Sequence, residues 1–195
     1  MRIFLYEGKT LHGEASYPLI IHAAERYLES AEFDMPGDEQ GENLDELYMK
    51  LARGPEILVS EKGRPYFADI PLEFSVSNCE DMWMCAISEK PCGIDIQVSK
   101  RAPHDKIATR FFKANEAEYA KVFGEAGFFT LWTRREAYGK MTGEGFWGEA
   151  PELVDKYMNL VEKIGDYHLS DIEVGDGIYC AVCTCDPAPY PIILI

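Results

Sequence analysis

FFTLWTRREAYGKMTGEG, residues 128–145, predicts one amphipathic helix with a glycine stop signal at its end. Trp132, Glu136 and Lys140 are spaced four residues apart, so their side chains share one face of this helix. Gly139 lowers helix stability by about 1 kcal/mol relative to alanine, which indicates that another segment packs closely there. Taken alone, Glu136 and Lys140 are more typical of a surface ion pair than of a functional site.

The composition is that of a folded protein with a buried core. The chain has 195 residues, of which 47% are hydrophobic, and fits one domain or two small lobes. Its formal net charge of −15 argues against nucleic acid as a partner, although a pocket can still be positive locally. Basic residues gather at Lys62 with Arg64, at Arg110 with Lys113, and at Arg134, Arg135 and Lys140.

No segment indicates a membrane or secreted protein. An apolar run of 18 residues is absent from the sequence, so no transmembrane span is expected. MRIFLYEG at the start lacks the features of a signal peptide, and we therefore expect a cytoplasmic protein. The six cysteines are then expected to be free thiols. Cys180, Cys183 and Cys185 are close in sequence, but no second Cys/His pair is spaced for tetrahedral zinc.

Periodicity predicts alternating groups of strands and helices. Strands are expected over residues 1–6, 57–60, 66–67, 74–77, 82–88, 93–98, 167–172, 177–185 and 191–195. Helices are expected over residues 17–30, 44–52, 104–112, 115–123 (capped by Asn115), 128–145 and 152–164, with an acidic loop over residues 29–43. Strand, helices and strands recur once in each half. The sequence therefore predicts an α+β fold of two similar α/β lobes, residues 1–92 and 93–195, which meet near residues 88–100.

Asp95 is the polar exception in the apolar strand over residues 93–98. A buried carboxylate is unfavourable without a cation or several donors, so either a structural salt bridge or a metal site would explain it. Asp95 and Glu136, with the amide oxygen of Gln97, would suit Mg²⁺, which prefers oxygen ligands. Lys140, one turn beyond Glu136, would then reach a phosphate bound to that metal.

Three separated motifs resemble the Sfp-type 4′-phosphopantetheinyl transferases. They are GRPYF with FSVSN and AIS in residues 63–88, GIDIQ at residues 93–97, and RFFKANEAEY with LWTRREAYGKMTGEG in residues 110–145. Members of this family move the phosphopantetheine arm of coenzyme A onto a serine of a carrier protein and release 3′,5′-ADP. The resemblance implies the 4′-phosphopantetheinyl transferase fold, in which two lobes related by a pseudo-two-fold axis form the active site between them.

The resemblance also implies a metal site and catalytic residues. Asp95 and Glu136 would hold Mg²⁺ on the coenzyme A pyrophosphate, and Gln97 stands where the family more often has an acidic ligand. Glu116 occupies the position of the family's additional acidic residue near the nucleophile. Lys140 would neutralise phosphate charge in the transition state. Either Glu116 or Glu136 could accept the proton of the serine hydroxyl.

Four residues would contact coenzyme A according to the same resemblance. Arg64, Ser77 and Arg135 would contact its phosphates. Asn78 stands where the family usually has a histidine; it can still donate a hydrogen bond to a phosphate but carries no charge. Arg135 stands where lysine is more common, which keeps the charge but replaces a point donor by a planar fork.

The leading hypothesis is a monomeric transferase that acts on coenzyme A and an acyl or peptidyl carrier protein. A non-catalytic relative that binds coenzyme A or a carrier protein is the alternative, because three family positions are altered. An unrelated Mg²⁺-dependent phosphotransferase is a third hypothesis. The sequence has no phosphate-binding loop of the G-x-x-x-x-G-K-[ST] type, so an NTP-dependent enzyme has little support.

Overall fold

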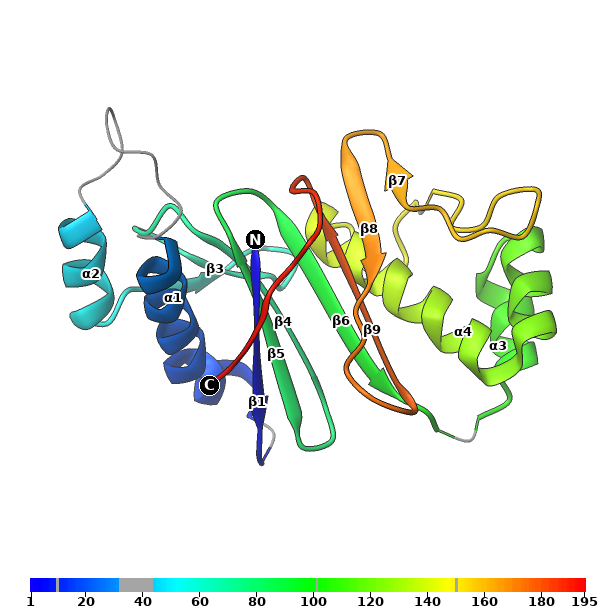
Figure 1. Cartoon of the computed structure of the whole chain (residues 1–195), viewed down its shortest axis with the longest axis horizontal. Helices are drawn as coiled ribbons and strands as arrows, with labels where there is room; N and C mark the ends of the chain where they lie inside the picture. The colour runs from blue at the N-terminus through cyan, green and yellow to red at the C-terminus, as the bar shows by residue number, and fades with distance from the viewer. Residues whose placement is uncertain (10, 32–43, 101, 150) are drawn as a thin grey trace.

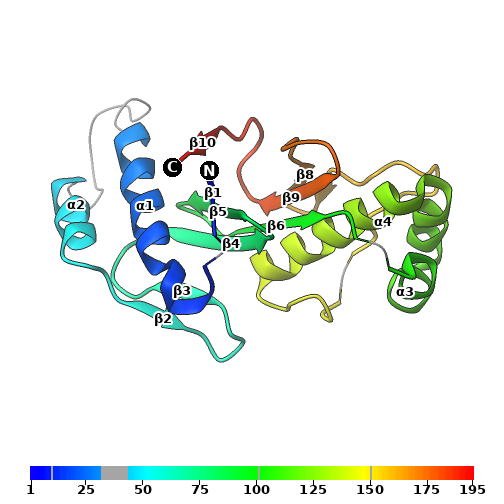
Figure 2. The same ribbon diagram turned by 90° about the horizontal axis from the view of Figure 1, so that it is seen from below.

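Two four-stranded sheets lie side by side in the middle of the molecule, with helices at either end (Figures 1 and 2). The computed structural model describes residues 1–9, 11–31, 44–100, 102–149 and 151–195. Most of the acidic loop expected over residues 29–43 lies outside these described residues. None of the described helices is long and apolar enough to cross a membrane.

The first sheet has the strand order β10-β1-β5-β4, in which only the β1/β10 pair is parallel. Its strands are β1 (Arg2–Glu7), β4 (Glu73–Cys79), β5 (Met82–Ser88) and β10 (Ile192–Leu194). The other elements of this half are η1 (Gly13–Ser16), α1 (Tyr17–Ala31), α2 (Leu44–Ala52) and the hairpin of β2 (Ile57–Val59) and β3 (Pro65–Phe67). β10 belongs to this sheet although it lies within residues 93–195, the predicted C-terminal lobe. A division of the chain at residue 92 would therefore separate β10 from the sheet in which it pairs.

The second sheet has the order β6-β9-β8-β7 and is antiparallel throughout. Its strands are β6 (Cys92–Val98), β7 (Lys163–Ile164), β8 (Tyr167–Asp171) and β9 (Ile178–Thr184). Helices α3 (His104–Phe111) and α4 (Ala114–Thr142) accompany it. The mixed α/β architecture expected from the sequence is present, and all predicted strands lie within two residues of their expected bounds.

The apolar side chains form three cores, because alternate residues of a strand point to opposite faces of its sheet. Phe4 faces α1 and contributes to the core between that helix and the first sheet. Its neighbours Ile3 and Leu5 face the other way and pack with Ile94 and Ile96 of β6 between the two sheets. A third core lies between the second sheet and helices α3 and α4. The layers therefore follow the order helices, sheet, sheet, helices (Figure 1).

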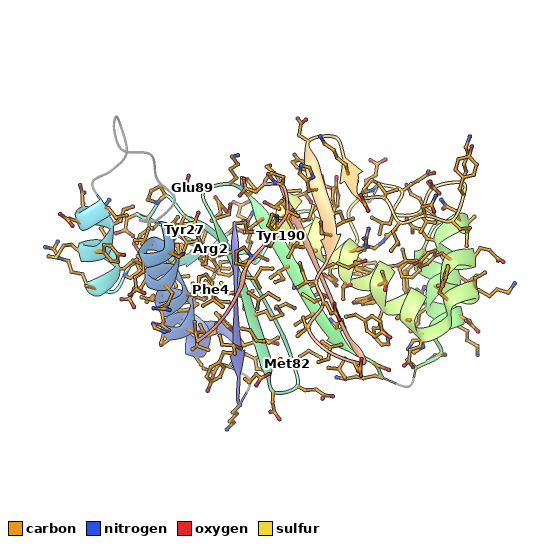
Figure 3. All side chains as sticks on the ribbon, in the orientation of Figure 1. Arg2, Phe4, Tyr27, Met82, Glu89 and Tyr190 are labelled. Atoms are coloured by element: carbon orange, nitrogen blue, oxygen red, sulfur yellow. The ribbon has the colours of Figure 1, made fainter. Side chains whose placement is uncertain are left out.

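Arg2 joins the first strand to the first helix (Figure 3). Its guanidinium carbon lies 5.4 Å from the centre of the Tyr27 ring, and its Nη2 donates to the Ser30 carbonyl at 3.0 Å. Burial raises the pKa of the Tyr27 hydroxyl to about 12. The tyrosine therefore stays neutral at physiological pH and packs as part of the core.

Side chains of β4 form the seam between the two sheets. Three alternate residues of β4 accept hydrogen bonds from three alternate backbone N–H groups of β6, so the strands are joined without a backbone ladder. The pairs are Ile94 N to Ser75 Oγ at 3.1 Å, Ile96 N to Ser77 Oγ at 3.2 Å, and Val98 N to Cys79 Sγ at 3.2 Å.

The six cysteines are free thiols, as expected, and five of them are buried. Burial raises the pKa of the Cys92 thiol to about 12 and that of Cys183 also to about 12. At physiological pH these thiols are protonated, whereas a nucleophile or metal ligand needs the thiolate. Cys92 and Cys183 therefore act as small apolar side chains of their strands.

Helix α4 is longer than expected and contains a break. Gly124 has φ 62° and ψ −140°, which separates the two helices predicted on either side of it. The N-cap is Lys113, and the predicted cap Asn115 was wrong, because the Glu116 carboxylate accepts the Lys113 N–H at 3.0 Å and fixes an earlier start. The helix ends before Gly143, whose φ of 71° is the left-handed conformation expected of a glycine stop.

The helix predicted over residues 152–164 was wrong. The segment contains a turn and then the short strand β7. Asp155 accepts hydrogen bonds from the backbone N–H groups of Tyr157 at 2.8 Å and Asn159 at 2.9 Å. A side chain that binds backbone donors two and four residues later offers the chain an alternative to a helix, and here the alternative is adopted.

The backbone of β6 touches the backbone of α4 at Gly93. A Cβ atom added to Gly93 would lie 2.0 Å from the Ala137 carbonyl oxygen and 2.7 Å from the Met141 nitrogen. No other residue type fits this position unless the helix moves away. The close approach places Asp95, two residues further along β6, beside the face of α4 that carries Glu136 and Lys140.

We expect Gly93→Ala to lower the free energy of unfolding by about 3 kcal/mol, because the new methyl group meets backbone atoms that cannot move independently. Urea denaturation followed by circular dichroism measures this change. Gly175→Ala is the matched control, since the nearest atom to its Cβ would be Ile178 Cδ1 at 3.3 Å. Equal stability of the two variants would contradict a direct contact between β6 and α4.

Candidate active site

An ion pair between Asp95 and Lys140 is the centre of the candidate site. Lys140 Nζ lies 2.8 Å from Asp95 Oδ1, and only 3% of Asp95 is exposed. Nζ also lies 2.9 Å from the Ile94 carbonyl oxygen and 3.4 Å from that of Val76. The three donors of the ammonium group thus have three acceptors, one from β4 and two from β6. The salt bridge considered for Asp95 from the sequence is therefore present.

Two further side chains hold the Asp95 carboxylate. Ser77 Oγ donates to Oδ1 at 2.8 Å, and Gln97 Nε2 donates to Oδ2 at 3.2 Å. Ser77 also accepts the Ile96 N–H, so it fixes Asp95 and the seam between the sheets together. Gln97 shares the face of β6 with Asp95, as the alternation of the strand predicted.

Glu136 lies half-buried on α4, near the same carboxylate. Burial raises the pKa of Glu136, the negative charge of Asp95 raises it further, and Lys140 lowers it. One lysine therefore faces two carboxylates, and the excess negative charge is what a divalent cation would neutralise. Among the described residues no group of three His, Cys, Asp or Glu side chains is placed to hold a metal. The two carboxylates with the amide of Gln97 suit Mg²⁺, which often completes its shell with water and substrate phosphates.

A pocket of about 270 Å³ borders this cluster. Its walls are the turn between β2 and β3, one side of β4 and the end of α4. Lys62, Arg64 and Lys140 contribute positive charge to the lining, and Val76 and Gly143 contribute to its walls. The sequence predicted a cationic group of this kind from the pairing of Lys62 with Arg64. An anionic ligand could thus bind next to the Asp95–Lys140 pair.

Gly139 forms part of the same pocket, and the close packing predicted for it is confirmed. A Cβ atom at this position would lie 2.5 Å from the Gly145 carbonyl oxygen. The Gly145 N–H donates to the Gly139 carbonyl at 3.0 Å. The chain therefore folds back on its own helix after Gly143 and forms one wall of the pocket.

Arg64 and Asn78, two of the residues predicted to contact coenzyme A, have different surroundings. Arg64 lines the pocket and its Nη2 lies 2.6 Å from Glu73 Oε2. Asn78 Nδ2 donates to the Leu11 carbonyl at 3.3 Å and lies 3.4 Å from His12 Nδ1. The structure thus brings Arg64 to the pocket, whereas Asn78 is not among its lining residues.

Arg135 points into the protein core, away from the pocket. Its guanidinium carbon lies 5.8 Å from the ring centre of Phe112 and 5.6 Å from that of Phe146, and the residue is 8% exposed. Nη2 lies 3.4 Å from Glu116 Oε2. Arg135 is not among the residues that line the pocket, and its contact with coenzyme A stays a prediction.

Glu116 is fully buried and all its recorded partners belong to the surrounding framework. Oε2 accepts the Lys113 N–H at 3.0 Å and faces Arg135, and Oε1 accepts the Leu153 N–H at 3.0 Å. The carboxylate joins the start of α4 to the segment after it. Among the described residues, the side-chain partners of Glu116 are Lys113, Arg135 and Leu153. The catalytic role expected of Glu116 stays a prediction.

Comparison with known proteins identifies the family. Residues 91–159 match the sequence profile of the 4′-phosphopantetheinyl transferase superfamily. The chain is 31% identical over 147 residues to the 4′-phosphopantetheinyl transferase AcpT of Escherichia coli (strain K12), which covers 70% of this chain and 68% of that relative. This chain belongs to the 4′-phosphopantetheinyl transferase superfamily. The resemblance to the Sfp-type transferases is thereby confirmed.

Two other members of the superfamily match over shorter shares of their length. The transferase gsp of Aneurinibacillus migulanus is 31% identical over 138 residues, which are 64% of this chain and 56% of gsp. The transferase Sfp of Bacillus subtilis (strain 168) is 27% identical over 141 residues, which are 65% of this chain and 62% of Sfp. The chain therefore spans less than two thirds of either relative. Asp95, Glu136 and Lys140 all lie within the segment that matches the superfamily profile.

Glu73 is a site residue that sequence reasoning missed. It stands at the start of β4 and contacts Arg64, nine residues earlier, in the turn between β2 and β3. Nothing in the local pattern distinguishes it from a charged strand end. Gly143 and Gly145, which also line the pocket, were recognised only as a helix stop, because their second role depends on the chain folding back after α4.

We expect Glu116→Gln to lower the free energy of unfolding by about 3 kcal/mol, because it leaves Arg135 buried without its counter-charge. The amide would also place donor hydrogens against the backbone N–H groups that the carboxylate accepts. Urea denaturation measures the loss, and Glu118→Gln is the control on the same helix, where the exposed Glu118 lies 3.6 Å from Lys121. Wild-type stability of Glu116→Gln with full loss of activity would instead indicate a catalytic glutamate.

Proposed function

We propose that this protein transfers the 4′-phosphopantetheine arm of coenzyme A to a serine of an acyl or peptidyl carrier protein, in a Mg²⁺-dependent reaction that releases 3′,5′-ADP. The observation that carries the proposal is the cluster of Asp95, Glu136 and Lys140 at the edge of a cationic pocket. The names of the superfamily members that the chain matches support the same reaction. The two helix-and-sheet halves support a monomer of two lobes related by a pseudo-two-fold axis, with their boundary near residue 92 and with β10 joined to the first lobe.

Asp95, Glu136 and Gln97 are the residues proposed to hold Mg²⁺. When bound, the ion would neutralise negative charge on the pyrophosphate oxygens. Ser77 supports this role, because its hydrogen bond orients the Asp95 carboxylate from the neighbouring sheet. The Gln97 side chain offers a carbonyl oxygen, while its nitrogen donates to Asp95.

Lys140 would stabilise the phosphate oxygens that gain charge during transfer. Its ammonium group is already fixed by Asp95 and two backbone carbonyls, so little reorganisation is needed when charge develops. Because Lys140 both lines the pocket and contacts Asp95, it lies at the boundary between the ligand and the carboxylates. Arg64, which lines the same pocket from the turn between β2 and β3, is proposed to contact another phosphate of coenzyme A.

Glu136 is the proposed base. In the reaction a bond forms between the serine Oγ and the phosphorus that carries the pantetheine arm, and the bond from that phosphorus to the ADP oxygen breaks. The hydroxyl proton would pass to Glu136, directly or through water. Glu116 is proposed to hold Arg135 and the start of α4 in place.

We expect an apo acyl carrier protein incubated with this protein, coenzyme A and Mg²⁺ to gain the mass of one phosphopantetheine arm. Glu136→Gln should reduce the transfer rate by at least about 100-fold, since a group that interacts with the transition state is lost. Mass spectrometry of the carrier protein measures both rates, with Glu118→Gln as the control. Binding of coenzyme A without transfer to any of several carriers would favour a non-catalytic relative.

We expect Lys140→Met to lower kcat by about 100-fold or more, because the methionine leaves the developing phosphate charge without its cation. Lys140→Arg should recover part of this loss, since the charge returns with a different donor geometry. Single-turnover transfer assays with saturating coenzyme A separate this effect from weaker binding. Unchanged kcat in Lys140→Met would remove the lysine from the proposed chemistry.

A further inference from the structure

The cations of the pocket differ in how their charge is balanced. Arg64 lies 2.6 Å from Glu73, and Lys140 lies 2.8 Å from Asp95, so each has a carboxylate partner. Lys62 lines the same pocket, and no carboxylate of the described residues lies within ion-pair distance of it. Across the described lining, the positive charge left uncompensated is therefore that of Lys62.

The turn that carries Lys62 is held by several hydrogen bonds. The Gly63 N–H donates to the Ser60 carbonyl at 2.9 Å, and the Arg64 N–H donates to Ser60 Oγ at 3.1 Å. The Ser60 N–H donates back to the Arg64 carbonyl at 2.9 Å, and Gly63 adopts a φ of 82° that favours glycine. Lys62 therefore projects from a defined turn at the pocket wall, although its side chain is exposed to solvent.

An anionic ligand meets an unfavourable field on most of this protein, because the chain carries a formal net charge of −15. A local cation at the mouth of a pocket then has a large relative effect on affinity. Glu61 and Glu144 are adjacent in sequence to the lining, but neither belongs to it. Glu73 approaches the pocket through its contact with Arg64.

We propose that Lys62 is a binding residue for a phosphate group of coenzyme A, and that Glu73 holds Arg64 while reducing the positive charge of the pocket. This assignment rests on the proposed function and adds two residues to it. The uncompensated charge of Lys62 attracts the phosphate group. Arg64 offers hydrogen-bond donors to the ligand, but its charge is largely cancelled by that of Glu73. The two residues should therefore influence binding in opposite directions.

The first test compares Lys62→Gln with Lys62→Arg by isothermal titration calorimetry with coenzyme A. We expect Kd to rise about 5-fold in Lys62→Gln, to remain near the wild-type value in Lys62→Arg, and to depend less on salt when the charge is absent. In the transfer assay the effect should fall on KM for coenzyme A. Lys121→Gln, an exposed lysine on α4 paired with Glu118, is the control.

The second test is Glu73→Gln, which keeps an acceptor for Arg64 and removes the negative charge. We expect coenzyme A to bind about 3-fold more tightly to this variant, as the loss of one like charge near an anion predicts. Wild-type affinity in Lys62→Gln, or an equal loss in Lys121→Gln, would overturn the role of Lys62. Weaker binding in Glu73→Gln would overturn the role of Glu73.

These outcomes are separate from failure of the proposed function. Binding of coenzyme A is measured without a carrier protein, so the Lys62 and Glu73 results stand even if no carrier is modified. Wild-type protein that transfers the arm while both variants bind like wild type would overturn only this inference. Wild-type protein that binds no coenzyme A in the titration would overturn both.

Discussion

The contact between the backbones of β6 and α4 at Gly93 is the constraint on which the rest of the site depends. A side chain at this position would overlap the Ala137 carbonyl, so the strand and the helix can meet only where the Cβ is missing. Asp95 lies two residues along the strand from this contact, and Glu136 and Lys140 lie beside it on the helix. Their spacing therefore follows from how closely two backbones approach, and the 2.8 Å ion pair is one result of that approach.

Lys140 belongs to the candidate active site and also contacts both sheets. Its acceptors come from both sheets, since Val76 belongs to β4 and Ile94 and Asp95 belong to β6. The same ammonium group that would face a phosphate thus helps to hold the two halves of the molecule together. A single cation placed among two carboxylates and two carbonyl oxygens leaves the cluster negative on one side, while the adjoining pocket is positive on the other.

The sequence predicted most elements and the centre of the site because both depend on short-range patterns. Alternation in residues 93–98 and the spacing of four between Glu136 and Lys140 are local signals, and Asp95 was conspicuous among apolar neighbours. The burial of Glu116 with Arg135 could not be predicted, because it depends on Phe112, Phe146 and Leu153 closing around them. The segment over residues 152–164 has helical periodicity, but the hydrogen bonds of Asp155 outweigh it.

The seam between β4 and β6 is formed by side chains, so substitutions there can change the spacing of the two sheets. A backbone ladder has the same geometry whatever residues it contains, so its spacing is almost independent of sequence. Here the linking atoms are the hydroxyls of Ser75 and Ser77 and the thiol of Cys79. Exchanging serine for cysteine or threonine at these positions would alter the distance between the halves in small steps. The spacing between the two sheets of this protein thus depends on three side chains of one strand.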